Sequence, residues 1–363
     1  MFSKVLAILL FTGTLVNAQD TLETNHSKWT VRGYIRALSM LEKPSMRLSI
    51  NSTTWLHNRL QLQRSFSDDL LFRIDLRTQV FYGNSIDSWF GYANEFKLKD
   101  ESINLNTLWW RNPHSEAHTN VERFLLSRNY TKTEITIGRQ RINWGMALTW
   151  NPNDLFQSGN PFNPDYVERP GVDAIRIQRS TGTLSGIEIA IARTGAGRSR
   201  GAWRYFGHKN SIDWQAIVGW YEHQPTVGFG WSGSMKRWSF RGELQSYLQH
   251  ESESGQIQVC LESDRLFKNN NYIRASLLYN QLGVVGEKNT SFFLTPQPKE
   301  LMPGKWSALF GWSVEPSLRF QYGANLFYTT ARHTCILMPH FQWTLSRNWQ
   351  ISFFTQITAQ ASG

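Results

Sequence analysis

The sequence predicts an all-β protein, a single antiparallel transmembrane β-barrel of about 16–18 strands with an inward-folded loop. Three observations predict this fold. Hydrophobicity alternates with period two along almost the whole chain, large aromatic residues are abundant in a polar sequence, and the N-terminus has the layout of an export signal.

Residues 1–18 have the features of a cleaved secretory signal peptide. Lys4 supplies a positive charge, the apolar run from Val5 to Phe11 follows, and Val16-Asn17-Ala18 offers small residues for cleavage. The apolar run is shorter than the roughly 20 residues of a membrane-spanning helix, which disfavours an uncleaved anchor. The sequence therefore predicts a signal peptide at 1–18 and one barrel domain at 19–363.

The composition favours a protein that contacts lipid on one face and water on the other. Aromatic residues make up 14% of the 363 residues and include 16 Trp, although the mean hydropathy is only -0.41. A soluble domain this polar rarely carries so many rings, whereas a membrane barrel uses them in the girdles at its two interfaces.

The period-two pattern begins near residue 28 and continues to the C-terminus. In 237–249, for example, Phe240 and Leu244 alternate with Glu243 and Gln245, which is the pattern of a strand with one apolar face. A soluble sandwich could show the same pattern in one strand, but unbroken repetition without a helical segment favours a barrel. The predicted strands are 28–41, 55–65, 70–82, 119–129, 133–142, 172–181, 186–194, 211–221, 226–235, 237–249, 256–264, 271–282, 306–314, 318–329, 333–344 and 348–360, with 104–111 and 202–208 as weaker additions.

The longest links between predicted strands are 83–103, 143–171 and 283–304, and the second is the candidate functional segment. Pro152, Pro161, Pro164 and Pro170 prevent a helix or a continuous strand there. Because the segment is also rich in aromatic rings and contains no lysine, we expect it to fold into the barrel and constrict it.

Two arginines before this loop pose a problem of orientation. Arg139 and Arg141 share the phase of the lipid-facing Ile137, and an arginine near the membrane midplane costs about 2–4 kcal/mol. Either a bulge at Gly138 reverses the faces, or the arginines lie beyond the apolar band. In both cases the two arginines can form ion pairs with the acidic residues Asp154, Asp165, Glu168 and Asp173. Such pairs could fix the loop in place, or the arginines could contact a solute. The predicted constriction residues are Arg139, Arg141, Asp154, Glu168, Arg169 and Asp173.

The same stretch resembles a signature of porin-like outer-membrane β-barrel proteins, distantly similar to barrels of the alginate-export type. The resemblance is carried by GRQRINWG at 138–145, WNPNDLF at 150–156 and RPGVDA at 169–174. It implies a location in the outer membrane of a Gram-negative bacterium, a barrel fold and a role in transport. It names no solute.

The charge distribution suggests the kind of solute. The net charge is +10, with 26 Arg against 12 Lys, but no basic run or motif points to nucleic acid. Arginines on the polar phase of the strands would line the lumen and favour small anionic solutes. The predicted lumen cations are Arg32, Arg36, Arg59, Arg73, Arg77, Arg176, Arg237, Arg241, Arg274 and Arg319.

An enzyme is the main alternative class. Serines and histidines are present, but no spacing selects a catalytic trio, and no Cys/His pattern indicates a metal site. Cys260 and Cys335 have opposite strand phases, so we expect free thiols. We predict a protein that is not an enzyme, needs no cofactor, and has outer-membrane lipid, the barrel-assembly machinery and small anionic solutes as partners. A barrel enzyme of the lipid-hydrolase type and a plugged structural barrel stay open as alternatives.

Overall fold

The computed structural model describes residues 6–15, 20–22, 28–43, 51–84, 101–159, 162, 171–251, 253–286, 297–346 and 349–360. Within these ranges the regular secondary structure is entirely β, and all of it belongs to one sheet. The strands are β1 (Leu6–Leu15), β2 (Asp20–Leu22), β3 (Lys28–Lys43), β4 (Asn51–Ser65), β5 (Leu70–Gly83), β6 (Asn106–Asn112), β7 (Ser115–Asn129), β8 (Thr133–Gln140), β9 (Val172–Gly182), β10 (Ser185–Arg193), β11 (Ser199–Lys209), β12 (Ile212–Tyr221), β13 (Gln224–Met235), β14 (Trp238–Tyr247), β15 (Gln256–Leu266), β16 (Asn271–Asn280), β17 (Trp306–Ser317), β18 (Phe320–Thr329), β19 (Thr334–Ser346) and β20 (Trp349–Ala359).

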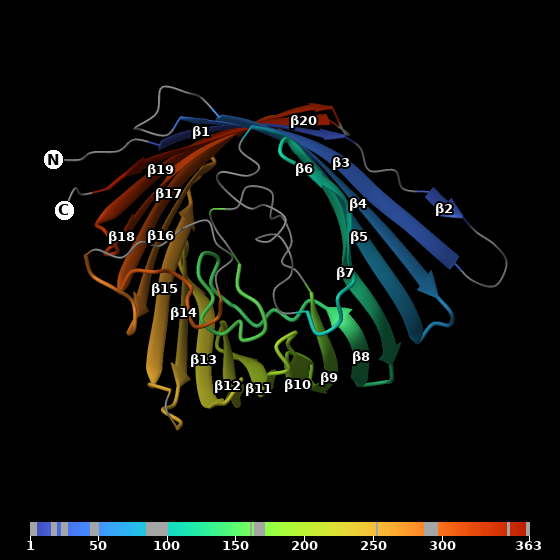
Figure 1. The fold of residues 1–363 in the computed structure, drawn as a ribbon. Coiled ribbons are helices and arrows are strands. Elements are labelled where there is room, and N and C mark those ends of the chain that lie inside the picture. Colours follow the sequence, from blue (N-terminus) through green and yellow to red (C-terminus); the bar gives the residue numbers. More distant parts are fainter. Residues whose placement is uncertain are drawn as a thin grey trace.

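The sheet closes into a barrel (Figure 1). The strands pair antiparallel around the ring. β3, β4, β5 and β7 follow one another, and β8 to β20 continue from β7 in sequence order. β1 closes the ring, because it pairs with both β3 and β20. β1 and β2 lie end to end along β3, and β6 and β8 lie end to end along β7. The segments therefore occupy 18 positions around the ring, and the predicted all-β barrel of about 16–18 strands is confirmed.

Every predicted strand, including the two weaker ones, corresponds to an observed strand with its ends moved by a few residues. The additional strands are β1 and β2. β1 lies inside the segment that the sequence predicts as a signal peptide. Because it runs antiparallel to both neighbours, removing it would leave β3 and β20 as neighbours that run in the same direction.

The two faces of the wall differ as the alternation predicts. On β13 the outward Val227 and Phe229 are exposed, whereas Gly228 and Gly230, which alternate with them, are buried toward the interior. The same holds around the ring, where outward isoleucine, leucine and aromatic side chains form an apolar belt. No helix among the described residues has the length and apolarity to span a membrane.

Both cysteines are free thiols, as expected. Cys260 is buried on the inner face. Cys335 lies on the outer face of β19, because it alternates with the inward-facing Thr334 and Ile336. The inner face near Cys260 departs from the expected wet and polar lumen, because Leu278, Leu309, Phe327, Ile336 and Met338 make one sector of it apolar. This sector packs on the chain segment that enters the barrel.

Candidate functional site

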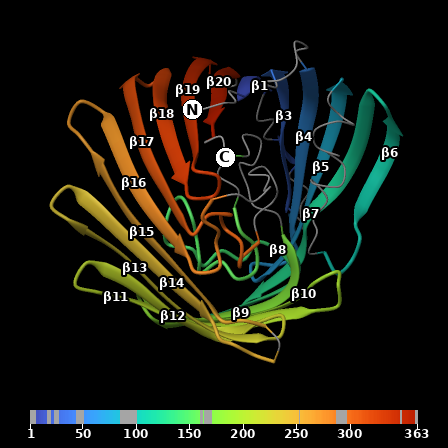
Figure 2. The same ribbon diagram turned by 60° about the vertical axis from the view of Figure 1, so that its left-hand side comes forward.

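A chain segment between β8 and β9 enters the interior of the barrel. We call residues 143–159 the lumen segment; it is drawn in green inside the ring of strands in Figures 1 and 2. It contains no strand or helix, so its backbone amides need hydrogen-bond acceptors from elsewhere. The prediction of an inward-folded loop holds for these residues, and the prediction for 160–161 and 163–170 lies outside the described residues.

Glu243 of β14 supplies the largest share of these acceptors. Its Oε1 accepts from the backbone N–H of Met146 at 2.5 Å and of Ala147 at 2.6 Å, and from Asn151 Nδ2 at 3.2 Å, while Oε2 accepts from Asn153 N at 2.9 Å. The side chain is fully buried. No cation within the described ranges forms an ion pair with it, so donors of the lumen segment stabilise the buried carboxylate.

Glu262 of β15 plays the same part for the next two residues. Its Oε1 accepts from Leu148 N at 2.9 Å, and its Oε2 accepts from Thr149 N at 3.1 Å and from Thr149 Oγ1 at 2.7 Å. The start of the segment is fixed internally, because Asp154 Oδ1 accepts from the backbone N–H of Trp144 at 2.6 Å and of Gly145 at 2.7 Å. Carboxylates therefore bind the backbone of most of 144–153.

Trp144 attaches the segment to the neighbouring wall. Its Nε1 donates to Glu188 Oε1 on β10 at 2.7 Å, and its carbonyl accepts from Gln215 Nε2 on β12 at 2.6 Å. The indole meets the ring of Phe156 edge to face, with 5.2 Å between centroids. A buried tryptophan whose N–H is bonded contributes packing without leaving an unsatisfied donor.

Farther along, aromatic side chains reach the apolar sector of the wall. Trp150 lies 6.2 Å from Phe327 and Phe162 lies 4.7 Å from it, measured between ring centroids, and Gln356 Nε2 of β20 donates to the carbonyl of Phe162 at 3.0 Å. The lumen segment and Phe162 thus contact strands from β10 to β20.

The wall makes room for the segment at two inward glycines of β13. A Cβ on Gly230 would lie 2.8 Å from Asn153 Nδ2 and 3.0 Å from Met146 Sδ, and a Cβ on Gly228 would lie 3.0 Å from Asn153 Oδ1. These distances are shorter than van der Waals contact. The glycines allow the irregular backbone to lie directly against the strand.

On β4, β5 and β7 the inner wall carries a different arrangement, in which arginines and carboxylates pair within the wall. Arg59 bonds Asp75 at 2.9 Å and Glu122 at 3.3 Å, Arg77 bonds Glu122 at 3.1 Å, and Arg73 bonds Asp75 through two nitrogens at 2.7 and 2.8 Å. Glu122 lies at a register shift of β7, where a bulge redirects the strand. We call these five residues the charged wall cluster; it holds three cations for two carboxylates.

Arg139 is buried inside the wall, where it closes the junction between β6 and β8. It bonds both oxygens of Asp173 at 2.8 and 3.0 Å, Glu101 at 3.0 Å, and the carbonyls of Val121 at 3.0 Å and Ile103 at 2.5 Å. Its side chain is 1% exposed. The predicted encounter of Arg139 with Asp173 is therefore present, while Glu101 and the backbone of 101–103 supply partners that the sequence analysis missed.

No register shift occurs at Gly138, so a bulge there does not move Arg139 to the other face. Gly138 has φ +112°, and a Cβ on it would lie 2.2 Å from the carbonyl oxygen of Phe124, which explains why glycine occupies the position. Arg141 is exposed and forms no ion pair in the part of the chain that is described. The two arginines, equivalent in the sequence analysis, have different environments.

The other predicted site residues divide into four groups. Arg59, Arg73, Arg77, Arg176 and Arg241 lie on the inner wall in ion pairs, the last two with Glu188 and Asp264. The inward-phase Arg274 is partly buried on β16, and Arg32 and Arg36 lie on β3. The prediction that Arg237 and Arg319 line the lumen is wrong, because both lie in exposed turns between strands. Glu168, Arg169 and Asp165 lie outside the described residues.

Sequence reasoning did not identify Glu188, Glu243 and Glu262 as the residues that bind the lumen segment. One signal was available for Glu243: it is an acidic residue on the inward phase whose cross-strand neighbours, Gly230 and Cys260, supply no cation. Among the described residues no group of His, Cys, Asp and Glu side chains could hold a metal ion.

Comparison with known proteins gives limited further information. No family model matches the chain, and no curated protein matches it. Among solved structures, a triple mutant of the Rhodopseudomonas blastica porin has a TM-score of 0.47 and 9% identity over 99% of this chain and 100% of that one. A Salmonella typhi OmpF complex with daunomycin has a TM-score of 0.47 and 8% identity over 98% and 97% of the two chains. The fold assignment of this chain therefore rests on its own strand pairings.

Proposed function

We propose that the chain is an outer-membrane channel for passive diffusion of small anionic solutes, constricted by the lumen segment. The observation that carries the proposal is a closed barrel with an apolar outer belt whose interior holds an irregular segment bound by wall carboxylates. An apolar belt requires lipid around it, and a segment across a lumen limits what passes.

The anion preference rests on arginines of the inner wall. Arg59, Arg73 and Arg77 lie together in the charged wall cluster, and Arg176 and Arg204 share the carboxylate of Glu188. Paired arginines attract an anion less than free ones do, so we expect a weak preference rather than strict selectivity.

The location rests on the export signal. We expect removal of residues 1–18, which would give a mature chain beginning at Gln19 and would require β3 and β20 to close the ring in place of β1. The mass of the protein purified from outer membranes measures this directly. A full-length mass would instead mean that Leu6–Leu15 stays in the barrel as β1. The narrower likeness to alginate-export barrels rests on the motifs of 138–174 alone.

Planar-bilayer recording in a salt gradient tests the function. We expect discrete conductance steps and a reversal potential displaced toward that of the anion. A clear preference for cations would contradict the proposed selectivity.

A second candidate, a barrel plugged by its own segment, is favoured by one observation. Trp144, Trp150, Leu155, Phe156 and Phe162 are almost completely buried inside the barrel, which is the packing of a core rather than of a channel lining. Complete absence of conductance from correctly folded protein would support this candidate against the channel.

A further inference from the structure

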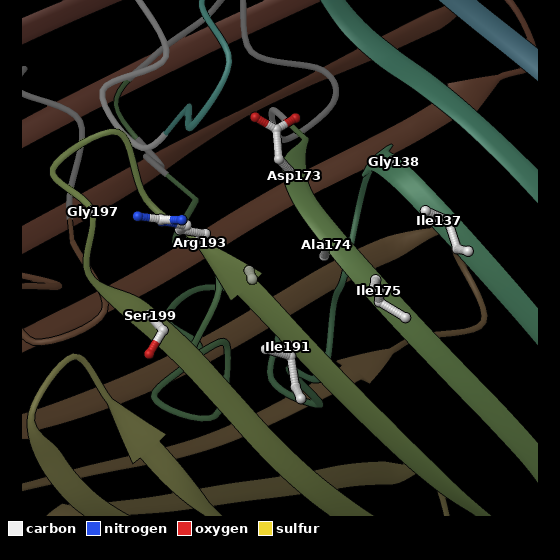
Figure 3. A pocket seen from close by; sticks show the side chains of 10 residues that line it. Ile137, Gly138, Asp173, Ala174, Ile175, Ile191, Arg193, Gly197 and Ser199 are labelled. Atoms are coloured by element: carbon white, nitrogen blue, oxygen red, sulfur yellow. The ribbon is translucent and has the colours of Figure 1, made fainter.

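A pocket of about 600 Å³ lies on the outer face of β8, β9 and β10 (Figure 3). Its floor contains Ile137, Ile175 and Ile191, which are 53%, 52% and 49% exposed. Ile175 is the cross-strand partner of both other isoleucines, so the three side chains form a row across neighbouring strands. Such a row would contact a hydrocarbon chain lying against the wall.

Polar groups border this row toward the β10–β11 hairpin. Arg193 and Ser199 are cross-strand partners on β10 and β11 and both line the pocket, so their side chains project from the same face. Arg193 is exposed, and no ion pair involving it occurs in the described ranges. Figure 3 shows its side chain beside Gly197 at the same end of the pocket. A cation without a carboxylate partner is thus available at the edge of an apolar surface.

The hydroxyl of Ser199 is arranged to donate. Its oxygen accepts a hydrogen bond from Trp220 Nε1 at 3.1 Å, and its own proton remains available for another acceptor. Trp220 is 38% exposed on the outer face. An outward indole with its N–H bonded near the strand end is typical of the membrane interface, where lipid head groups lie.

The acidic residue that lines the pocket, Asp173, does not form an ion pair with Arg193. Its carboxylate is held by Arg139 at 2.8 and 3.0 Å and by the backbone N–H groups of Ser102 and Ile103 at 3.0 and 3.1 Å. Its charge is therefore compensated within the wall, and Arg193 gives the rim an uncompensated positive charge.

We propose that this pocket binds an anionic phospholipid of the surrounding membrane. The phosphate contacts the guanidinium of Arg193 and the hydroxyl of Ser199, and an acyl chain lies over the three isoleucines. The inference rests on the membrane location of the proposed function and is independent of conduction. Arg193 and Ser199 lie at the end of the barrel where β8 ends and β9 begins, so the phosphate would lie at that end of the apolar belt.

Native mass spectrometry of the detergent-solubilised barrel tests the proposal with phosphatidylglycerol and with phosphatidylcholine of the same acyl chains. We expect wild type to retain phosphatidylglycerol preferentially, and Arg193→Gln to weaken this binding about tenfold through the lost charge-assisted bond. Ile175→Ser is expected to weaken binding of long-chain phosphatidylglycerol while leaving the short-chain dihexanoyl form little changed.

Arg179→Gln is the matched control, because Arg179 is an exposed arginine of β9 near the opposite end of the barrel. Its phosphatidylglycerol binding should equal that of wild type, and thermal unfolding should show that all variants are folded. The proposal would be overturned if wild type retained the two lipids equally, or if Arg193→Gln and Arg179→Gln lost phosphatidylglycerol equally. It would also be overturned if excess inorganic phosphate displaced the lipid. Bilayer conductance is measured separately, so failure of the lipid site and failure of the channel are distinguishable.

Discussion

Two parts of the inner wall use carboxylates differently. In the charged wall cluster on β4, β5 and β7, Asp75 and Glu122 bond arginines of neighbouring strands of the wall, at most two strands away. On β14, Glu243 has glycine and cysteine as cross-strand neighbours and bonds backbone amides of the lumen segment. Asp75 and Glu122, which have neighbouring cations, complete the wall, whereas Glu243, which has none among the described residues, binds an irregular segment. Glu262 is intermediate, because Arg241 approaches it at 3.6 Å while it accepts three segment donors.

The difference assigns separate roles to the two regions. Changes in the segment-binding carboxylates should alter how the lumen is occupied. Changes in the charged wall cluster should alter which ions pass.

Glu243→Gln should have the largest effect. The amide would place a donor against Met146 N or Asn153 N and remove the charge from four hydrogen bonds, so docking of the segment should weaken by at least about 3 kcal/mol. Limited proteolysis should then cleave within 143–159. The control is Glu134→Gln, which changes an inward carboxylate that accepts from Ser127 and Thr136 hydroxyls instead. Similar cleavage in both variants would argue against a specific role of Glu243.

Arg139→Gln should destabilise the barrel by about 3 kcal/mol, because it leaves Asp173 and Glu101 without their buried cation. Arg141→Gln should change stability by less than about 0.5 kcal/mol, since Arg141 is exposed. Equilibrium unfolding of the two refolded variants in detergent measures the contrast. Equal destabilisation would show that the two arginines share one environment after all.

Glu122→Gln should change ion selectivity. Arg59 and Arg77 would lose the carboxylate that they share, so the positive potential of this side of the lumen should increase. The reversal potential should move by several millivolts farther toward that of the anion, since one charge per lumen changes. A shift toward the cation would contradict the placement of this cluster beside the ion path.

The smallest effect concerns pH. Burial raises the pKa of Glu101, which lies in the segment before β6, to about 7 in spite of the nearby Arg139. Because the folded protein binds this proton more tightly than the unfolded chain does, the contribution of Glu101 to stability should decrease as pH rises from about 4.5 to about 7. Glu101→Gln should lack this part of the pH dependence, and an unchanged profile of unfolding against pH would refute it.

The strands could be predicted from the sequence because alternation is a local property that each strand displays by itself. The segment's position could be predicted only in outline, from its prolines and rings. Its partners could not, because the bond from Met146 to Glu243 joins residues 97 positions apart and depends on which strands face each other across the lumen. Arg139 was ambiguous for the same reason: its burial comes from residues 101–103, which strand phase does not reveal. The apolar sector on which Trp150 packs was not predicted either, because the alternation was expected to turn polar residues toward the lumen.

If wall carboxylates hold the lumen segment across a channel, releasing the segment should widen the path. Single-channel conductance of Glu243→Gln is compared with that of wild type in the same bilayer and salt. We expect a clearly larger conductance for the variant. An unchanged conductance from folded Glu243→Gln protein would contradict this expectation.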